Sequence, residues 1–328
     1  MHEALAHRAL AIVAAACVAA AAASTVLAAP AEQRHLTLTL DWTPNPDHVG
    51  FYYARDKGLF AKAGLDVAIR SPSDPSAALK LVAVGRTDLA VSYEPELFYA
   101  AARKLPVVAV AAVVPRPLNS IMTIDPGLRR VADLRGHTVG ITGVPSDYAA
   151  LDTALAGAGL TRKAVTVVNV GYNLLPALLS HKVDAVLGVY RNVEAIELEQ
   201  RGVKPTVIPL DRAGIPPYDE LVLVASKKRL AADAAYADAV RRFVGAFVAG
   251  TNAARRDPKG ALEVLRHATA AKDAFLERAT PATLRLLAGA GCPKPARWAR
   301  YGRWMRAHGL LKKPVATSAV VTRRYCAP

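Results

Sequence analysis

Cysteine is scarce in this chain, and the scarcity limits the kinds of site that it can build. Only three cysteines occur in 328 residues. That number excludes a disulfide-dense scaffold and any zinc or iron–sulfur framework held by many cysteines. Because 52% of the residues are hydrophobic, the chain can still bury a core of useful size, and its length favours two lobes over one.

The common local signatures of catalysis and cofactor binding are also missing. The sequence contains no HExxH, GxSxG or GxGxxG motif. The histidines are scattered, so a metal cluster would have to be assembled by the fold. We therefore expect no metal centre, no cofactor and no catalytic residues.

Long apolar runs are absent beyond the N-terminus. Residues 10–23 form an Ala- and Val-rich run, and Ala29-Pro30-Ala31 fits a small-x-small cleavage pattern. Residues 1–31 are therefore predicted to be a secretory signal peptide of the Sec type. The run is shorter than the roughly 20 residues of a membrane-spanning helix. An uncleaved anchor and lipidation at Cys17 are the alternatives to the expected soluble periplasmic protein.

Removal of residues 1–31 would leave only Cys292 and Cys326. Two cysteines in an oxidising compartment are expected to pair. We predict a Cys292–Cys326 disulfide, and the alternative is two buried thiols.

The chain has fewer acidic than basic residues, and most of the basic excess lies in its C-terminal third. The chain has 42 Lys and Arg against 27 Asp and Glu, a net charge of +15. Residues 220–328 hold 21 of the basic and 7 of the acidic residues, whereas residues 32–219 hold 20 and 19. Such a charge permits nucleic acid, an anionic membrane surface or an acidic ligand as partner. Because the excess lies in the C-terminal third, we interpret it as a solvated helical surface.

Short β-rich runs alternate with helical patterns, including a single helix predicted over residues 51–63. This rhythm predicts an α/β fold of two lobes, each a mainly parallel sheet covered by helices, followed by a helical C-terminal region. The predicted limits are 1–31 for the signal peptide, 32–122 for the first part of lobe 1, 123–219 for lobe 2, and 220–328 for the return to lobe 1 with the C-terminal helices. A ligand would bind between the lobes, at the carboxyl ends of the strands.

The first candidate segment is Asp41-Trp42-Thr43-Pro44-Asn45-Pro46-Asp47-His48, directly after the first predicted strand. Trp42 in this rigid loop could stack on a planar ligand, and Asp41 and Asn45 could hydrogen-bond its edge. His48 could also contact the ligand. The alternative is a packed Trp42, with Asp41 capping a turn and His48 starting a helix.

The second segment places Tyr93 and Glu94 at the mouth of a helix whose first turn contains Pro95. Both side chains are candidate ligand contacts. The alternative for Glu94 is a first-turn acid that complements the helix dipole.

The third segment connects a strand to an Ala-rich helix through Gly143, Ser146 and Tyr148. Gly143 permits close approach of the backbone, and free N–H groups near Ser146 could receive a ligand oxygen or phosphate. The alternative is a simple capped helix.

The fourth segment contains Tyr190 and Glu194, four residues apart and therefore on one face if the segment is helical. An aromatic ring with a carboxylate one helical turn away is suited to bind a planar, nitrogen-bearing ring. The alternative is a packed Tyr190 and a Glu–Arg surface pair.

These segments together resemble the thiamine-pyrimidine-precursor binding proteins of bacterial ABC importers, the NMT1-like family. The resemblance covers roughly residues 35–230. It is carried by Asp41-Trp42-Thr43-Pro44-Asn45, by Ala54-x-x-Lys57-Gly58-Leu59-Phe60-x-x-x-Gly64-Leu65 and by Gly188-Val189-Tyr190-x-Asn192-x-Glu194. The second of these stretches is shared with sulfonate, nitrate and taurine binders, so it indicates the superfamily and not the ligand.

The resemblance implies a type II periplasmic-binding fold that closes by hinge motion and delivers its ligand to a membrane permease with a cytoplasmic ATPase. It also implies that Trp42 and Tyr190 stack on an aminopyrimidine ring, while Asp41 and Glu194 accept its hydrogen bonds. Asn45 lies in the same matching motif.

We therefore expect a monomeric binding protein for hydroxymethyl- or formylamino-pyrimidine, and neither an enzyme nor a nucleic-acid binder. One alternative keeps the fold and binds a flavin precursor, a sulfonate or a nitrate-like anion. Another is an enzyme, because the yeast-type pyrimidine-phosphate synthase belongs to the same branch. The present sequence lacks the Cys-rich, iron-associated run of that enzyme.

Overall fold

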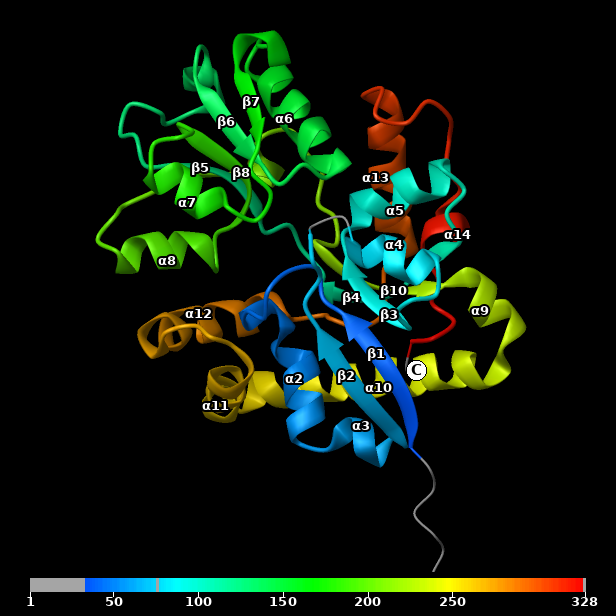
Figure 1. Cartoon of the computed structure of the whole chain (residues 1–328). Coiled ribbons are helices and arrows are strands. Elements are labelled where there is room, and N and C mark those ends of the chain that lie inside the picture. Colours follow the sequence, from blue (N-terminus) through cyan, green and yellow to red (C-terminus); the bar gives the residue numbers. More distant parts are fainter. Residues whose placement is uncertain (1–32, 75–76, 327–328) are drawn as a thin grey trace, which may run out of the picture. The chain divides into compact units, whose positions relative to one another are not determined.

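Two five-stranded sheets organise the computed structural model, which describes residues 33–74 and 77–326 (Figure 1). The predicted signal peptide lies outside the described residues. In spatial order, the strands of the first sheet are β2 (Leu65–Arg70), β1 (Arg34–Thr39), β3 (Leu89–Ser92), β10 (Leu221–Ser226) and β4 (Val107–Val114). Those of the second sheet are β7 (Thr166–Asn169), β6 (Thr138–Ile141), β8 (Ala185–Tyr190), β5 (Asn119–Thr123) and β9 (Thr206–Pro209).

Both sheets are mixed, and not mainly parallel as predicted: in each of them two strand pairs are parallel and two are antiparallel. The antiparallel pairs arise because each sheet has one strand that opposes both of its neighbours. In the first sheet this strand is β10, and in the second it is β5. Each of them is the first strand that the chain enters after it crosses from the other sheet. Since β1 is parallel to β3, and β6 is parallel to both β7 and β8, the loops that leave these strands gather at one edge of their own sheet.

Helices pack on both faces of the first sheet (Figure 1). The elements between residues 46 and 134 are η1 (Pro46–His48), α2 (Val49–Asp56), α3 (Leu59–Lys62), α4 (Ala77–Ala83), α5 (Glu94–Ala102) and η2 (Val131–Leu134). Those of the second sheet are α6 (Pro145–Gly157), η3 (Arg162–Ala164), α7 (Leu174–Leu179), α8 (Glu194–Gln200) and η4 (Leu210–Arg212). The C-terminal part holds α9 (Lys227–Ala232), α10 (Ala234–Arg256), α11 (Pro258–Ala268), α12 (Asp273–Leu286), α13 (Pro295–Ala307) and α14 (Thr317–Val320), so the predicted helical C-terminal region is present.

The single helix expected over residues 51–63 is wrong. The chain forms α2 and α3 instead, with Gly58 between them at a φ of 69°. This left-handed conformation cannot continue a right-handed helix, and glycine adopts it without a Cβ clash. Apolar residues continue on both sides of Gly58, and for this reason their pattern predicted one helix.

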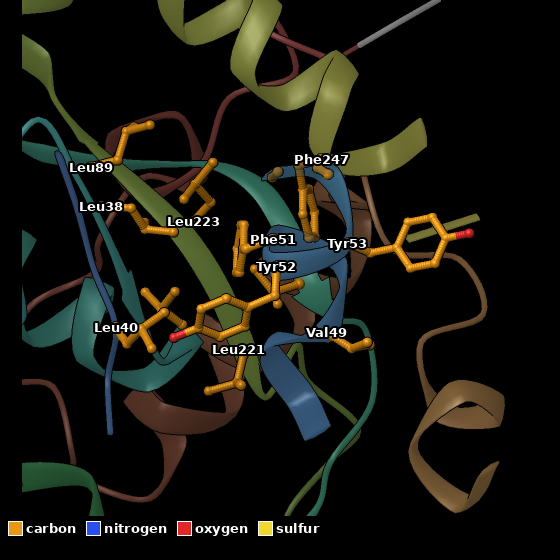
Figure 2. Close-up of a cluster of buried hydrophobic side chains, with 14 of the residues drawn as sticks. Leu38, Leu40, Val49, Phe51, Tyr52, Tyr53, Leu89, Leu221, Leu223 and Phe247 are labelled. Atoms are coloured by element: carbon orange, nitrogen blue, oxygen red, sulfur yellow. The ribbon is translucent and has the colours of Figure 1, made fainter. Parts of the chain in front are cut away.

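The packing of α2 against the first sheet and α10 fixes the loop that precedes α2. Figure 2 shows Phe51 of α2 among Leu38, Leu223 and Phe247, and the rings of Phe51 and Phe247 stack with centroids 4.4 Å apart. The two helices approach closely because Gly250 has no side chain: a Cβ there would lie 2.8 Å from the carbonyl oxygen of Gly50. The start of α2 is therefore held rigidly, directly after the loop 41–48.

The outer edge of β4 is covered by two segments from the C-terminal region. Gly291 exchanges backbone hydrogen bonds with Ala112 at 2.7 and 2.8 Å, and the backbone N–H of Thr322 donates to Ala109 at 3.0 Å. The predicted disulfide is present between Cys292 and Cys326, whose Cα atoms are 5.2 Å apart. It ties the two covering segments together, and a covered edge cannot pair with a strand of another chain.

The basic C-terminal surface is formed in part by α13. Arg300, Arg303 and Arg306 are exposed there. Arg297 on the same helix is largely buried, donates to the carbonyl oxygen of Pro115 at 2.7 Å and pairs with the carboxylate of Asp219. The interpretation as a solvated surface therefore holds for three of these arginines and not for Arg297. Within the described ranges, no helix has the length and apolar character that crossing a membrane requires.

Replacing both Cys292 and Cys326 by serine should lower the free energy of unfolding by about 3–4 kcal/mol, because the disulfide closes a loop of 34 residues. Urea denaturation followed by circular dichroism measures the change. Reductant should destabilise the wild type to the level of the double variant and leave the variant unaffected. A wild type that is insensitive to reductant under denaturing conditions would contradict the prediction.

Candidate ligand-binding site

A cavity lies among the loops that leave the strands of both sheets. Its lining residues are Asp41, Trp42, Tyr93, Thr142, Tyr172, Leu174, Gly188, Tyr190 and Glu194. The cavity therefore brings together five of the residues expected from the sequence, from positions up to 153 apart in the chain, with aromatic rings and carboxyl groups in its wall.

Asp41 is held in place by two hydrogen bonds. His48 Nε2 lies 2.8 Å from Oδ1 of Asp41, and the hydroxyl of Tyr93 donates to Oδ2 at 3.1 Å. Nδ1 of His48 accepts from the backbone N–H of Asn45 at 3.3 Å, which assigns the proton to Nε2. Each carboxylate oxygen of Asp41 keeps a lone pair for a ligand donor.

His48, a predicted ligand contact, does not line the cavity. Its side chain is completely buried and is occupied on both ring nitrogens. It lies behind Asp41 because the turn η1 folds the loop back on itself. The role that the structure gives to His48 is to orient the carboxylate of Asp41.

Asn45 also has a local role in place of the expected ligand hydrogen bond. Its Oδ1 accepts from the backbone N–H of Asp47 at 2.8 Å, and its Nδ2 donates to the carbonyl oxygen of Thr43 at 3.1 Å. Asn45 is thus the N-cap of η1, the position that asparagine favours. Both ends of its amide are used within the loop.

Tyr172 also lines the cavity, although it was not predicted from the sequence. Its ring lies 6.3 Å from that of Trp42, and its hydroxyl donates to the carbonyl oxygen of Asp41 at 2.8 Å. Tyr172 follows β7 just as Trp42 follows β1. An aromatic residue directly after the end of a predicted strand was the signal that could have found it.

Tyr190 and Glu194 both line the cavity, but not as members of one helix. Tyr190 is the last residue of β8 and Glu194 the first residue of α8, so the expected shared helical face is wrong. They meet because Oε2 of Glu194 accepts from the backbone N–H of Tyr190 at 2.7 Å. Burial raises the pKa of Glu194 to about 8, so at neutral pH its carboxyl group is mostly protonated and can both donate and accept.

Glu94 is not part of the cavity wall. It is completely buried, and its Oε2 accepts from the backbone N–H of Asp219 at 2.7 Å. This contact joins the start of α5 to the segment that returns from the second sheet. Burial, with the charge of Asp219, raises the pKa of Glu94 well above its usual value.

The backbone N–H groups near the start of α6 are occupied by carboxylates of the chain itself. Oδ2 of Asp147 accepts from the N–H groups of Thr142 at 2.9 Å and Gly143 at 3.2 Å, and Oε1 of Glu96 accepts from that of Ser146 at 2.9 Å. The backbone donors of Gly143 and Ser146, which were expected to be free for a ligand oxygen, therefore already have acceptors within the protein. Burial raises the pKa of both acids, that of Asp147 to about 7.

Tyr148 lies outside the site. Its ring faces the guanidinium of Arg162 at 5.1 Å, on the side of α6 that is turned away from the cavity. One residue along a helix rotates the side chain by about 100°. This rotation separates Tyr148 from Asp147, its buried neighbour.

A second cavity adjoins the first and shares Tyr93, Thr142, Gly188 and Tyr190 with it. Its wall includes Glu220, whose Oε2 accepts from the backbone N–H groups of residues 118 and 119 and from the hydroxyl of residue 218. Glu220 thereby ties together the two segments that cross between the sheets. In the part of the chain that the structure covers, no group of three or more His, Cys, Asp and Glu side chains could hold a metal ion.

Comparison with known sequences connects the chain to pyrimidine proteins. A family model described as NMT1/THI5 like matches residues 45–261. A thiamine biosynthesis protein of Haemophilus influenzae is 41% identical over 193 residues, which are 58% of this chain and 62% of that protein. The formylaminopyrimidine-binding protein of Halalkalibacterium halodurans is 40% identical over 190 residues, 57% of each chain. The chain thus covers less than two thirds of the length of either relative.

More distant relatives include an enzyme. A 4-amino-5-hydroxymethyl-2-methylpyrimidine phosphate synthase of Saccharomyces cerevisiae is 28% identical over 167 residues, 50% of this chain and 48% of the enzyme.

Solved structures of similar fold include binding proteins. The alkanesulfonate-binding protein of Xanthomonas axonopodis pv. citri has a TM-score of 0.68 at 19% identity and covers 89% of this chain and 99% of its own. The ligand-binding component of an ABC-type import system from Staphylococcus aureus has a TM-score of 0.68 at 15% identity, covering 89% and 98%. The predicted α/β fold of the periplasmic binding proteins is confirmed by these similarities.

The buried carboxyl groups make stability depend on pH. The pKa values of the fully buried acids are raised, chiefly by desolvation, to about 6 for Asp47, about 7 for Asp147 and Glu220, and about 8 for Glu194. In the unfolded chain such groups titrate near pH 4. Between about pH 4 and pH 8 the folded state therefore binds more protons than the unfolded state, so the free energy of unfolding should fall as the pH rises.

Glu194→Gln should reduce this loss of stability, most clearly between pH 6 and pH 8, because glutamine does not titrate. Urea denaturation at a series of pH values measures the slope. Glu197→Gln is the matched control, since Glu197 lies on the same helix but is half-exposed and paired with Arg201. Equal slopes in the two variants would show that Glu194 is ionised in the folded protein at neutral pH.

Proposed function

The chain belongs to the NMT1/THI5-like family, and from this premise we propose that it is the periplasmic substrate-binding component of an ABC importer for an aminopyrimidine precursor of thiamine. The ligand would be of the hydroxymethylpyrimidine or formylaminopyrimidine type. The observation that carries the proposal is the pair of carboxyl groups, Asp41 and Glu194, within a single aromatic-walled cavity.

The two carboxyl groups suit the edge of an aminopyrimidine. Such an edge presents amino N–H donors beside ring nitrogens that accept. The carboxylate of Asp41 is oriented by His48 and Tyr93 and offers lone pairs to the amino group. Glu194, kept protonated by burial, can donate to a ring nitrogen through one oxygen and accept through the other.

The aromatic residues suit the faces of the same ring. Trp42, Tyr172 and Tyr190 line the cavity together. Stacking of a base-like ring on an aromatic side chain contributes about 1–3 kcal/mol per contact. Stacking and hydrogen bonding to a charged acceptor, about 1.5–3 kcal/mol, support binding in the micromolar range or tighter after the costs of association.

An anionic ligand fits the site less well. A sulfonate or nitrate needs free donors, and the backbone N–H groups of Thr142, Gly143 and Ser146 are bound by Asp147 and Glu96. The lining of the cavity adds two more acids and no Lys or Arg. An anion would therefore be desolvated beside carboxyl groups.

The binding role is favoured over the enzymatic one by the two relatives of about 40% identity, one of which is named a formylaminopyrimidine-binding protein. The synthases share less of the sequence, at 28% identity. Formation of a pyrimidine phosphate during incubation with the purified protein would overturn the binding role. The importer role is supported by the fold shared with an ABC-type import component and by the predicted export signal.

Trp42→Ala should weaken binding of 4-amino-5-hydroxymethyl-2-methylpyrimidine about 5- to 150-fold, because it removes one stacking contact. Isothermal titration calorimetry of the protein without residues 1–31 measures the dissociation constant. Tyr148→Ala is the control, since this tyrosine lies outside the cavity, and its affinity should equal that of the wild type. Equal losses in the two variants would contradict the assigned site.

Asp41→Asn should weaken the same pyrimidine at least tenfold, because the charged acceptor for the amino group becomes a neutral amide. Methanesulfonate should not bind the wild type measurably in the same calorimetric experiment. Tight binding of methanesulfonate, or unchanged pyrimidine affinity in the variant, would favour the anion-binding alternative.

A further inference from the structure

Asn192 lies between two ligand-site residues, Tyr190 and Glu194, yet it does not line the cavity. Its Nδ2 donates to Oδ1 of Asp47 at 2.8 Å and to Oγ1 of Thr283 at 2.9 Å. These three side chains come from the loop after β8, from η1 and from α12, and all are buried. The contact therefore joins the loop after β8, residues 190–194, to η1 and α12.

The contact is incompletely satisfied, which distinguishes it from ordinary core packing. Among the described residues, neither Oδ2 of Asp47 nor Oδ1 of Asn192 has a hydrogen-bond partner, although both atoms are buried. An unpaired buried polar atom is unfavourable, because it has lost its hydrogen bonds to water without replacing them. Separation of the loop from η1 would hydrate both oxygens, so the structure contains a favourable contact and a built-in cost of keeping it closed.

The contact is directly coupled to the ligand-binding carboxylates on both sides. Asp47 precedes His48, which orients Asp41. Asn192 lies within the turn in which Glu194 accepts from the backbone of Tyr190. Asp47 is thus linked to Asp41 through His48, and Asn192 stands two residues from both Tyr190 and Glu194.

Two other hydrogen bonds join the loops of the two sheets near the cavity. The hydroxyl of Tyr172 donates to the carbonyl oxygen of Asp41, and the N–H of Ser146 donates to Glu96. Neither leaves a buried oxygen without a partner. Of these three contacts, that between Asp47 and Asn192 is the one that leaves buried oxygens without partners.

We propose that Asn192, with Asp47 and Thr283, forms a latch that holds the ligand loop 190–194 against the loop 41–48 and so limits the rate of ligand release. Asn192 is a positioning residue, because it acts on the ligand through Tyr190, Glu194 and Asp41. The identity of the ligand used below rests on the proposed function, whereas the latch itself does not.

Asn192→Ala should accelerate dissociation of 4-amino-5-hydroxymethyl-2-methylpyrimidine about 10- to 100-fold and leave the association rate within about twofold, because the lost contact is a hydrogen bond to a carboxylate. Stopped-flow measurement of Trp42 fluorescence gives both rates. Thr283→Val should act in the same direction. Asp47→Asn retains an acceptor for Asn192 and should release ligand more slowly than Asp47→Ala.

The control is Asn252→Ala on α10, which should keep the wild-type rates. Hydrogen exchange of the ligand-free protein, followed by mass spectrometry, tests the latch without any ligand. Peptides covering residues 190–200 should exchange at least tenfold faster in Asn192→Ala and Thr283→Val than in the control.

The two proposals fail in different ways. If the wild type does not bind the pyrimidine but exchange accelerates as described, the ligand assignment fails and the latch stands. If exchange and dissociation rates are unchanged in both Asn192→Ala and Thr283→Val, the latch is overturned.

Discussion

The hydrogen bond between His48 and Asp41 is the constraint on which the site depends. A buried carboxylate is costly unless donors surround it, and here the donors are His48 and Tyr93. The backbone of Asn45 fixes the tautomer of His48, and the packing of α2 against α10 fixes the backbone that follows. Asp41 is thereby presented to the cavity by a rigid support that extends from the first strand into the core.

The same principle, acids buried with their donors, governs the rest of the cavity region. Asp147 and Glu96 take the N–H groups at the start of α6, Glu194 takes that of Tyr190, and Glu220 takes those of the crossing segment. In a fold whose neighbours include alkanesulfonate binders, this use of internal carboxylates removes the donors that an anion requires. The proposed selectivity against anions thus follows from the hydrogen bonds that these backbone N–H groups already donate to internal carboxylates.

Much of the architecture could be predicted from the sequence. The alternation of β-rich and helical runs predicted two α/β units followed by a helical region, because burial of one or both faces leaves a direct pattern in neighbouring residues. The exception at Gly58 arose because apolar periodicity does not register a single left-handed residue. Tyr172 was missed for a related reason: the short loop after β7 has no regular pattern, and only its place at a strand end marks it.

The sequence by itself determined the α/β fold, the family and the aromatic and acidic residues from which the cavity is built, because these depend on local periodicity and on motif spacing. The tertiary structure decided which of those residues line the cavity. Five predicted residues have suitable chemistry but other contacts. Four of them form hydrogen bonds inside the protein, namely Glu94, Asn45, His48 and Ser146. The fifth, Tyr148, is rotated away from the cavity and faces Arg162. A polar side chain binds whichever partner the fold brings nearest, and partners such as Asp219 for Glu94 or Asp47 for Asn192 lie more than a hundred residues away in the chain.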